Sequence, residues 1–297
     1  MTQVSDQAFP DIICIGSVLW DVIGRCANPM HQGGDIPGRI TRVPGGVALN
    51  IAMALRRFGL APSLLSAVGL DVEGDALISA CAARGVQTDM VYRSADLPTD
   101  QYMAIEASNG LIAAIADAHS LEAAGAKILE PLAAITDSFE GTVALDGNLT
   151  VDLLSQMARS PLLARADMRV APASPGKALR LLPFLETGRG TIYVNIEEAG
   201  LLCQTKFETS RDAAQTLCAR GAARAVVTDS GNPASFAADD TLLTQTPPPV
   251  AVTRVTGAGD TFMAAHIAAE LRGAPAEDAL EQALAAAALY VAGKTTI

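Results

Sequence analysis

Aromatic residues are scarce in this chain, at 4% of 297 residues, with one Trp, four Tyr and seven Phe. Hydrophobic residues as a whole nevertheless make up 50% of the sequence. This composition is typical of an alanine-rich, helix-heavy globular protein. The length is sufficient to bury a sizeable core, in one large α/β domain or in two domains.

Cysteine and histidine are too few and too scattered to indicate a metal site. The cysteines are odd in number and form no CxxC pair, and the three His do not cluster. This usage excludes a zinc site of the usual spacing and predicts reduced, mostly buried thiols. The cysteines are Cys14, Cys26, Cys81, Cys203 and Cys218.

Basic residues are outnumbered, 21 to 32, which gives a net charge of −11 with no basic stripe. Nucleic acid is therefore an unfavourable partner, and a small molecule is favoured. Residues 1–7 lack the cationic and apolar regions of a signal peptide, and Glu281 interrupts the longest alanine-rich run. We predict a cytoplasmic protein that does not span or bind a membrane.

Short apolar runs alternate with amphipathic helical segments along the chain. This alternation predicts an α/β fold with a doubly wound, mostly parallel sheet. The predicted strands of this sheet are 12–15, 64–68, 142–145, 169–171, 191–194 and 225–228.

Two stretches interrupt this rhythm, at 22–43 and 86–117. The first is rich in Gly and Pro, and the second contains short strand patterns (91–93, 101–106 and 111–115) with a hairpin turn at Ser108-Asn109-Gly110. We predict a single domain over 1–297, in which these two insertions form a small β lid. The exposed strand edges of such a lid favour a homodimer.

The sequence Gly257-Ala258-Gly259-Asp260 joins a glycine turn, a helix start and a carboxylate. An apolar helix follows, so the three backbone amides are expected to converge at its positive end and to bind a phosphate. Asp260 beside an anion site indicates a base that removes a proton while the amides hold the anion. We predict phosphoryl transfer to a hydroxyl, with all four residues catalytic.

A second glycine turn lies at Gly45-Gly46, just before an apolar helix that contains Asn50. Two adjacent glycines let the backbone approach a ligand closely, and Asn50 offers a donor and an acceptor to a sugar diol. Asp21 follows the first predicted strand, at the edge where open α/β sheets bind ligands. Each feature has a plain alternative, a simple turn or a cap, but together they predict a sugar site.

The two glycine turns, in this order, resemble the two signatures of the PfkB (ribokinase-like) family of sugar and nucleoside kinases. The second signature usually reads Asp-Thr-x-Gly-Ala-Gly-Asp, and here Arg254 stands at its first acid. The resemblance implies a ribokinase-like fold and an ATP-dependent kinase, with the sugar held by Asp21, Gly45, Gly46 and Asn50. It also supports the homodimer, because family members often pair their lids.

The resemblance extends to the cofactor sites. Asn195 and Glu198 match the family's Asn-x-x-Glu element, which implies a site for Mg²⁺ and ATP with Glu198 toward the metal; Asn195 as a helix cap is the alternative. Thr228, Ser230 and Gly231 resemble the ATP loop, together with Gly257 and Gly259. The sequence leaves open whether K⁺ binds near the C-terminal loop.

Within this family, the pattern of the pseudouridine kinases is the most similar. The similarity implies phosphorylation of a nucleoside 5′-hydroxyl and suggests Gln101 and Asp117 as lid residues near the ligand, with ordinary lid packing as the alternative. Ribose, adenosine or a sugar acid as the acceptor, and a nonenzymatic sugar-binding regulator, are the remaining hypotheses. The similar segments are 44–50, 99–102, 114–117, 145–149 and 172–177.

Overall fold

The main sheet has eight strands in the order β14-β13-β12-β11-β10-β9-β1-β4. The computed structural model describes residue 10 and residues 12–295. Neighbouring strands pair in parallel through β4, β1, β9, β10, β11 and β12. Strand β13 pairs antiparallel with both β12 and β14. The strands are β1 (Ile12–Ile15), β4 (Ser63–Leu65), β9 (Thr142–Asp146), β10 (Asp167–Ala171), β11 (Thr191–Asn195), β12 (Arg224–Asp229), β13 (Asn232–Ala238) and β14 (Thr241–Gln245).

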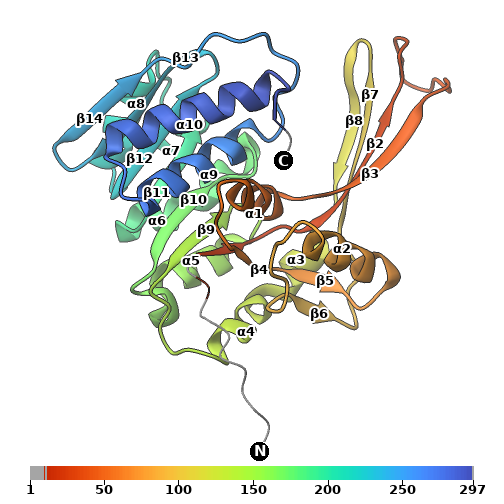
Figure 1. Cartoon of the computed structure of the whole chain (residues 1–297), viewed down its shortest axis with the longest axis horizontal. Coiled ribbons are helices and arrows are strands. Elements are labelled where there is room, and N and C mark those ends of the chain that lie inside the picture. The colour runs from red at the N-terminus through yellow and green to blue at the C-terminus, as the bar shows by residue number, and fades with distance from the viewer. Residues whose placement is uncertain (1–9, 11, 296–297) are drawn as a thin grey trace, which may run out of the picture.

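Helices cover both faces of this sheet (Figure 1). Alternate residues of β1 point to opposite faces, so Ile13 and Ile15 join the core under α5 to α8, whereas Ile12 and Cys14 join the core under α1, α2, α9 and α10. The predicted doubly wound fold is thereby confirmed. The helices are α1 (Val47–Arg57), α2 (Val72–Ala82), α3 (His119–Ala124), α4 (Glu130–Ala133), α5 (Val151–Arg159), α6 (Leu182–Thr187), α7 (Ile196–Cys203), α8 (Ser210–Ala219), α9 (Ala258–Leu271) and α10 (Ala276–Val291).

A separate four-stranded sheet projects away from the helices, as Figure 1 shows, and has the form of a lid. Its order is β3-β2-β7-β8, with β2 and β7 parallel and the outer pairs antiparallel. The predicted hairpin turn joins β7 to β8, where Gly110 has a φ of 105°. The strands are β2 (Leu19–Arg25), β3 (Arg39–Gly45), β7 (Gln101–Ala107) and β8 (Gly110–Ala116).

Two predicted strands were assigned to the wrong sheet, wholly or in part. The run 64–68 is not one strand, because the chain leaves the main sheet at Ser66, whose carbonyl accepts a hydrogen bond from the Tyr92 N–H at 2.9 Å. The run 91–93 belongs to a third, two-stranded sheet rather than to the lid. A continuous apolar run cannot reveal this change of partner. The two strands of this sheet are β5 (Ala67–Gly69) and β6 (Tyr92–Ser94).

The five cysteines are free thiols, three of them buried, as the sequence predicts. Burial raises the pKa of the Cys14 thiol far above its usual value, which keeps this group unreactive. No helix in the described part of the chain combines the length and the apolar composition that a membrane span requires.

Candidate active site

The predicted anion site lies at the first turn of α9. Gly257 is the N-cap with a φ of 86°, in the left-handed region that favours glycine, and no side chain caps the helix. The Ala258 N–H donates to the Val255 carbonyl at 3.0 Å. Within the described residues the Gly257 and Gly259 amides have no acceptor, so two of the three predicted amides are available to an anion.

Asp260 lies in the same turn and meets the second glycine motif through Asn50. The Asn50 Nδ2 donates to Asp260 Oδ2 at 3.0 Å, which joins residues 210 positions apart. Burial raises the pKa of the Asp260 carboxyl to about 7, the Asn50 hydrogen bond opposes this rise, and the negative charges of Asp146 and Asp21 add to it. A carboxyl with a pKa near neutrality is suited to accept a proton from a hydroxyl.

The raised pKa predicts a pH dependence of catalysis. Because the base must be ionised, we expect kcat/KM to fall as the pH drops below about 7, by roughly tenfold per unit. The contribution of this group to the free energy of unfolding has the opposite trend and rises as the pH drops. A carboxyl whose pKa is higher in the folded state favours folding when it is protonated. A pH-rate profile between pH 5 and 9 that stays flat would contradict the assignment of the base.

The glycine pair brings Asp21 to the start of α1. A Cβ on Gly45 would overlap the Asp21 carboxylate, and a Cβ on Gly46, which has a φ of 98°, would overlap the Ser17 carbonyl oxygen. Position 46 therefore requires glycine, whereas a side chain at position 45 would force the Asp21 carboxylate to move. Burial raises the pKa of Asp21 to about 6, so this carboxylate also lies in a weakly solvated place.

Asp21 lies on β2, in the lid sheet, rather than at the end of the first core strand. Its register partner on β7 is Tyr102, so the two side chains share one face of the lid. Burial and the Asp21 charge both raise the pKa of the Tyr102 hydroxyl. Tyr102 is a candidate ligand residue that the sequence analysis missed, because only the strand register places it beside Asp21.

The other two lid candidates have different surroundings. Gln101 is the register partner of Trp20, on the face opposite Asp21, and its carbonyl accepts from the Asp117 N–H at 2.9 Å. The Asp117 carboxylate bonds His119 Nδ1 at 2.8 Å, and this hydrogen bond lowers its pKa. The roles of Gln101 and Asp117 toward a ligand stay predictions.

A buried carboxylate next to the site also escaped the sequence analysis. Asp146, at the end of β9, has no exposed surface and accepts from the Ser17 N–H at 2.8 Å and the Ser17 hydroxyl at 2.5 Å. The Ser17 oxygen in turn accepts from the Val47 N–H at 2.9 Å, which fixes the start of α1. The sequence feature that could have indicated Asp146 is its position as an acid at the carboxyl end of a strand that pairs with β1.

Asn195 and Glu198 form a reciprocal capping box at the start of α7. The Glu198 N–H donates to Asn195 Oδ1 and the Asn195 N–H donates to Glu198 Oε2, both at 2.8 Å. Burial raises the pKa of Glu198 to about 7. The cap alternative is what the geometry shows, and no cluster of three metal-ligating side chains occurs in the described part of the chain.

The predicted ATP loop lies beside this cap. Thr228 is the register partner of Asn195 across β11 and β12, so both lie at the same edge of the sheet. Ser230, where the family usually has glycine, has a φ of 51°, and the exposed Gly231 completes the turn into β13. The backbone thus keeps the left-handed conformation that glycine favours.

Arg254, at the position of the family's first acid, anchors the segment before α9. Its guanidinium stacks 3.7 Å above the Tyr290 ring, and its Nε donates to the Tyr290 carbonyl at 2.8 Å. The Tyr290 hydroxyl donates to the Thr256 carbonyl, also at 2.8 Å. The replacement therefore fixes the approach to the glycine turn through α10 rather than through a carboxylate.

Comparison with known proteins shows the family to which this fold belongs. The pfkB family carbohydrate kinase model matches residues 10–297. A pseudouridine kinase from Escherichia coli (strain K12) is 27% identical over 269 residues, which are 89% of this chain and 85% of that protein.

Solved structures share the fold over nearly the whole chain. A carbohydrate kinase from Agrobacterium tumefaciens is 26% identical with a TM-score of 0.81, covering 96% of this chain and 91% of the other. An Arabidopsis thaliana ribokinase complexed with ribose and ATP is 21% identical with a TM-score of 0.77, covering 95% and 92%. The likeness to this ribokinase is evidence of a common fold.

Proposed function

This chain belongs to the pfkB family of carbohydrate kinases, and from that premise we propose that it transfers a phosphoryl group from ATP to the 5′-hydroxyl of pseudouridine. One observation carries the proposal: Asp260, a carboxyl with a pKa near 7, lies in the same helical turn as two available amides and is held by Asn50. A base beside an anion site is the arrangement that phosphoryl transfer to a hydroxyl requires.

Each step of the reaction has its own residues. Asp21 and Asn50 bind the ribose hydroxyls next to the Gly45-Gly46 backbone, and Asp260 accepts the proton of the attacking hydroxyl. The Gly257 and Gly259 amides hold the transferring phosphoryl group.

The cofactor residues fit Mg·ATP. Magnesium is commonly held by phosphates, water and one or two carboxylates, so it does not need a cluster of several protein ligands. Glu198 uses Oε2 to accept from the Asn195 N–H, and its other carboxylate oxygen suits a contact with the metal through water. Bound Mg²⁺ would supply positive charge to the phosphates. Thr228, Ser230 and Gly231 would contact the nucleotide from the adjacent strand edge.

Pseudouridine differs from uridine by a ring N–H that the C-glycosidic bond leaves free. A lid acceptor that pairs with this donor discriminates strongly, because uridine would leave the acceptor buried and unpaired. Asp117 is our candidate for this acceptor through its Oδ2, because both contacts with His119 are made by Oδ1. Support for this substrate comes from the similarity to the Escherichia coli enzyme.

A substrate panel tests the assignment. With Mg·ATP, we expect kcat/KM for pseudouridine to exceed the values for uridine, cytidine, adenosine and ribose. In this proposal Asp21 and Asn50 bind the sugar and not the base, so ribose is the second candidate. If another substrate exceeds pseudouridine by about tenfold, the pseudouridine assignment is wrong, while the kinase assignment survives.

We further propose a homodimer formed through the lid. One face of the lid sheet exposes Ile40 by 77%, Ile115 by 69% and Met103 by 50%, an apolar surface that a second lid can cover. We expect sedimentation to give a dimer at micromolar concentration, and Ile115→Lys to shift it toward monomer. Ile135→Lys, at an exposed apolar position outside the lid, is the control. A wild-type protein that sediments only as a monomer would contradict the dimer.

A further inference from the structure

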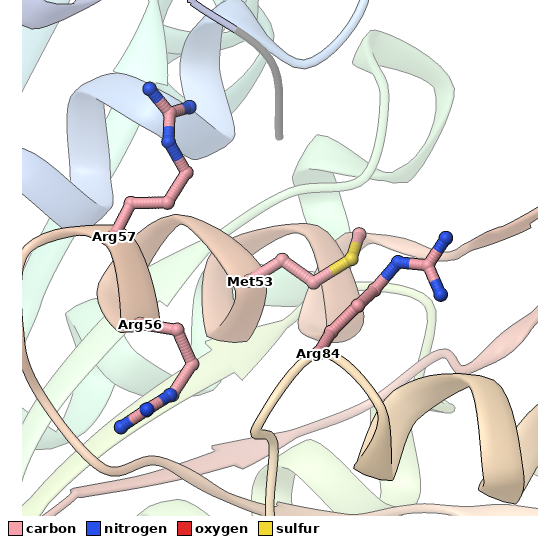
Figure 2. A pocket seen from close by; sticks show the side chains of 4 residues that line it. All are labelled: Met53, Arg56, Arg57 and Arg84. Carbon is pink, nitrogen blue, oxygen red and sulfur yellow. The ribbon is translucent and has the colours of Figure 1, made fainter.

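Three arginines surround a cavity at the C-terminal end of α1, away from the carboxylates of the active site. Arg56 and Arg57 belong to the last turn of α1, Arg84 follows α2, and Met53 completes the lining of a cavity of about 280 Å³ (Figure 2). No acidic residue lines it. In a chain with a net charge of −11, such a cavity is a local exception to the overall charge.

The charges of these arginines are not neutralised by protein carboxylates. Within the part of the chain that the structure describes, none of the three forms an ion pair. Arg56 donates one N–H to the Leu60 carbonyl at 2.7 Å, and Arg84 donates one to the Ala80 carbonyl at 2.8 Å. Most of their donor capacity is left for another acceptor.

The Arg56 Nε is buried and has no hydrogen-bond partner in the described structure. A buried donor without an acceptor is unfavourable and is uncommon in folded proteins. Gly85 borders this group closely, because a Cβ on Gly85 would lie 2.9 Å from the Arg56 Nε. The Arg56 guanidinium therefore packs directly against Gly85, which leaves no room for a side chain at that position.

The positive charge extends around the end of the helix. Burial lowers the pKa of Arg57, and the charge of Arg254 lowers it further. In Figure 2, Arg56 and Arg57 leave α1 on opposite sides, while the Arg84 guanidinium lies toward the tip of Met53. Attraction to the negative end of the α1 dipole accounts for arginines at this place. It does not account for the unpaired Nε or for the missing carboxylate.

We propose that this cavity binds a small phosphoryl anion, with Arg56 and Arg84 as its ligands. Guanidinium groups recognise phosphate oxygens through paired hydrogen bonds, and such an anion supplies acceptors for the terminal N–H groups of Arg56 and Arg84 that do not bond the Leu60 and Ala80 carbonyls. Drug-sized ligands occupy pockets of roughly 300–1,000 Å³, so a cavity of about 280 Å³ suits pyrophosphate or a single phosphate ester group.

The proposed anion site shares helix α1 with Asn50. Asn50, which holds Asp260, lies six residues before Arg56 on the same helix, or about 9 Å along its axis. An anion that fixes the last turn of α1 therefore acts on the element that positions the base. The anion site itself is independent of which substrate the kinase uses.

Calorimetric titration with inorganic pyrophosphate tests the proposal on the full chain, with saturating Mg·ADP present so that the nucleotide site is filled. We expect Arg56→Gln/Arg84→Gln to weaken pyrophosphate binding by roughly tenfold or more. The control Arg165→Gln/Arg211→Gln removes two charges elsewhere and leaves binding unchanged. Equal binding by wild type and the Arg56/Arg84 variant overturns the site.

Two further measurements identify the class of ligand and control for unfolding of the double variant. A nucleoside monophosphate that binds as tightly as pyrophosphate assigns the site to phosphate esters, whereas citrate binding equally well overturns the phosphoryl assignment. If thermal melting shows that the double variant is unfolded, the single change Arg84→Gln, at an exposed side chain, replaces it, with at least a threefold loss expected. Unchanged binding by that single variant would also reject the proposal.

Discussion

Replacement of Asp260 by Asn should lower kcat by about a hundredfold or more, the usual scale for the loss of a general base. The amide can still contact Asn50, so the geometry at the start of α9 is retained. Thermal stability should not fall, because burial disfavours the native carboxylate and the substitution removes its charge. Steady-state kinetics with Mg·ATP, together with thermal melting, measure both quantities.

The matched control is Asp278→Asn. Asp278 is an exposed acid in the first turn of α10, so this change removes the same charge from a comparable helix position away from the site. We expect its kcat to equal that of the wild type. Comparable turnover by the Asp260 variant, with unchanged stability, would remove Asp260 from the mechanism.

Gly46→Ala should both destabilise the protein and impair sugar binding. The new Cβ would overlap the Ser17 carbonyl oxygen, and the φ of 98° is strained for alanine. Left-handed strain together with overpacking costs roughly 2–4 kcal/mol in the free energy of unfolding. Any shift of Ser17 also disturbs its hydrogen bonds to Asp146, so KM for the acceptor should rise several-fold or more.

The variant Gly59→Ala separates the effect of backbone strain from the effect of the overlap with Ser17. Gly59 follows the same helix with a φ of 83°, but a Cβ there would meet no atom within 4 Å. We expect this variant to lose only about 1–2 kcal/mol and to keep the wild-type KM. Denaturant unfolding and initial-rate kinetics compare the two variants. Equal effects of both would mean that the close contact with Ser17 has no part in the site.

The local motifs of the candidate active site could be predicted from the sequence. A glycine turn, an apolar helix and an acid are close neighbours along the chain, so the start of α9 with Asp260 follows from local rules. The pairing of Asp260 with Asn50 did not follow from either motif alone. It depends on the packing of α1 against α9, and only the similarity to a kinase family indicated that the two turns share one site.

Residues that reach the site through strand pairing could not be found from local sequence motifs. Tyr102 reaches Asp21 because β2 and β7 pair in parallel, although the strands are far apart in the sequence. Asp146 meets Ser17 because β9 lies beside β1. A run such as 64–68 is equally apolar whether it forms one strand or two, so the change of sheet at Ser66 is decided by tertiary contacts.

The central claim, that Asp260 drives phosphoryl transfer from ATP to a sugar hydroxyl, is tested most directly by following the phosphorus. Phosphorus NMR of a mixture of the protein, Mg·ATP and pseudouridine observes ATP, ADP and any new phosphate ester together. We predict a 5′-monoester that appears in step with ADP, and its loss in the Asp260→Asn variant. Folded wild-type protein that forms no ester with pseudouridine, uridine, cytidine, adenosine or ribose would contradict the claim.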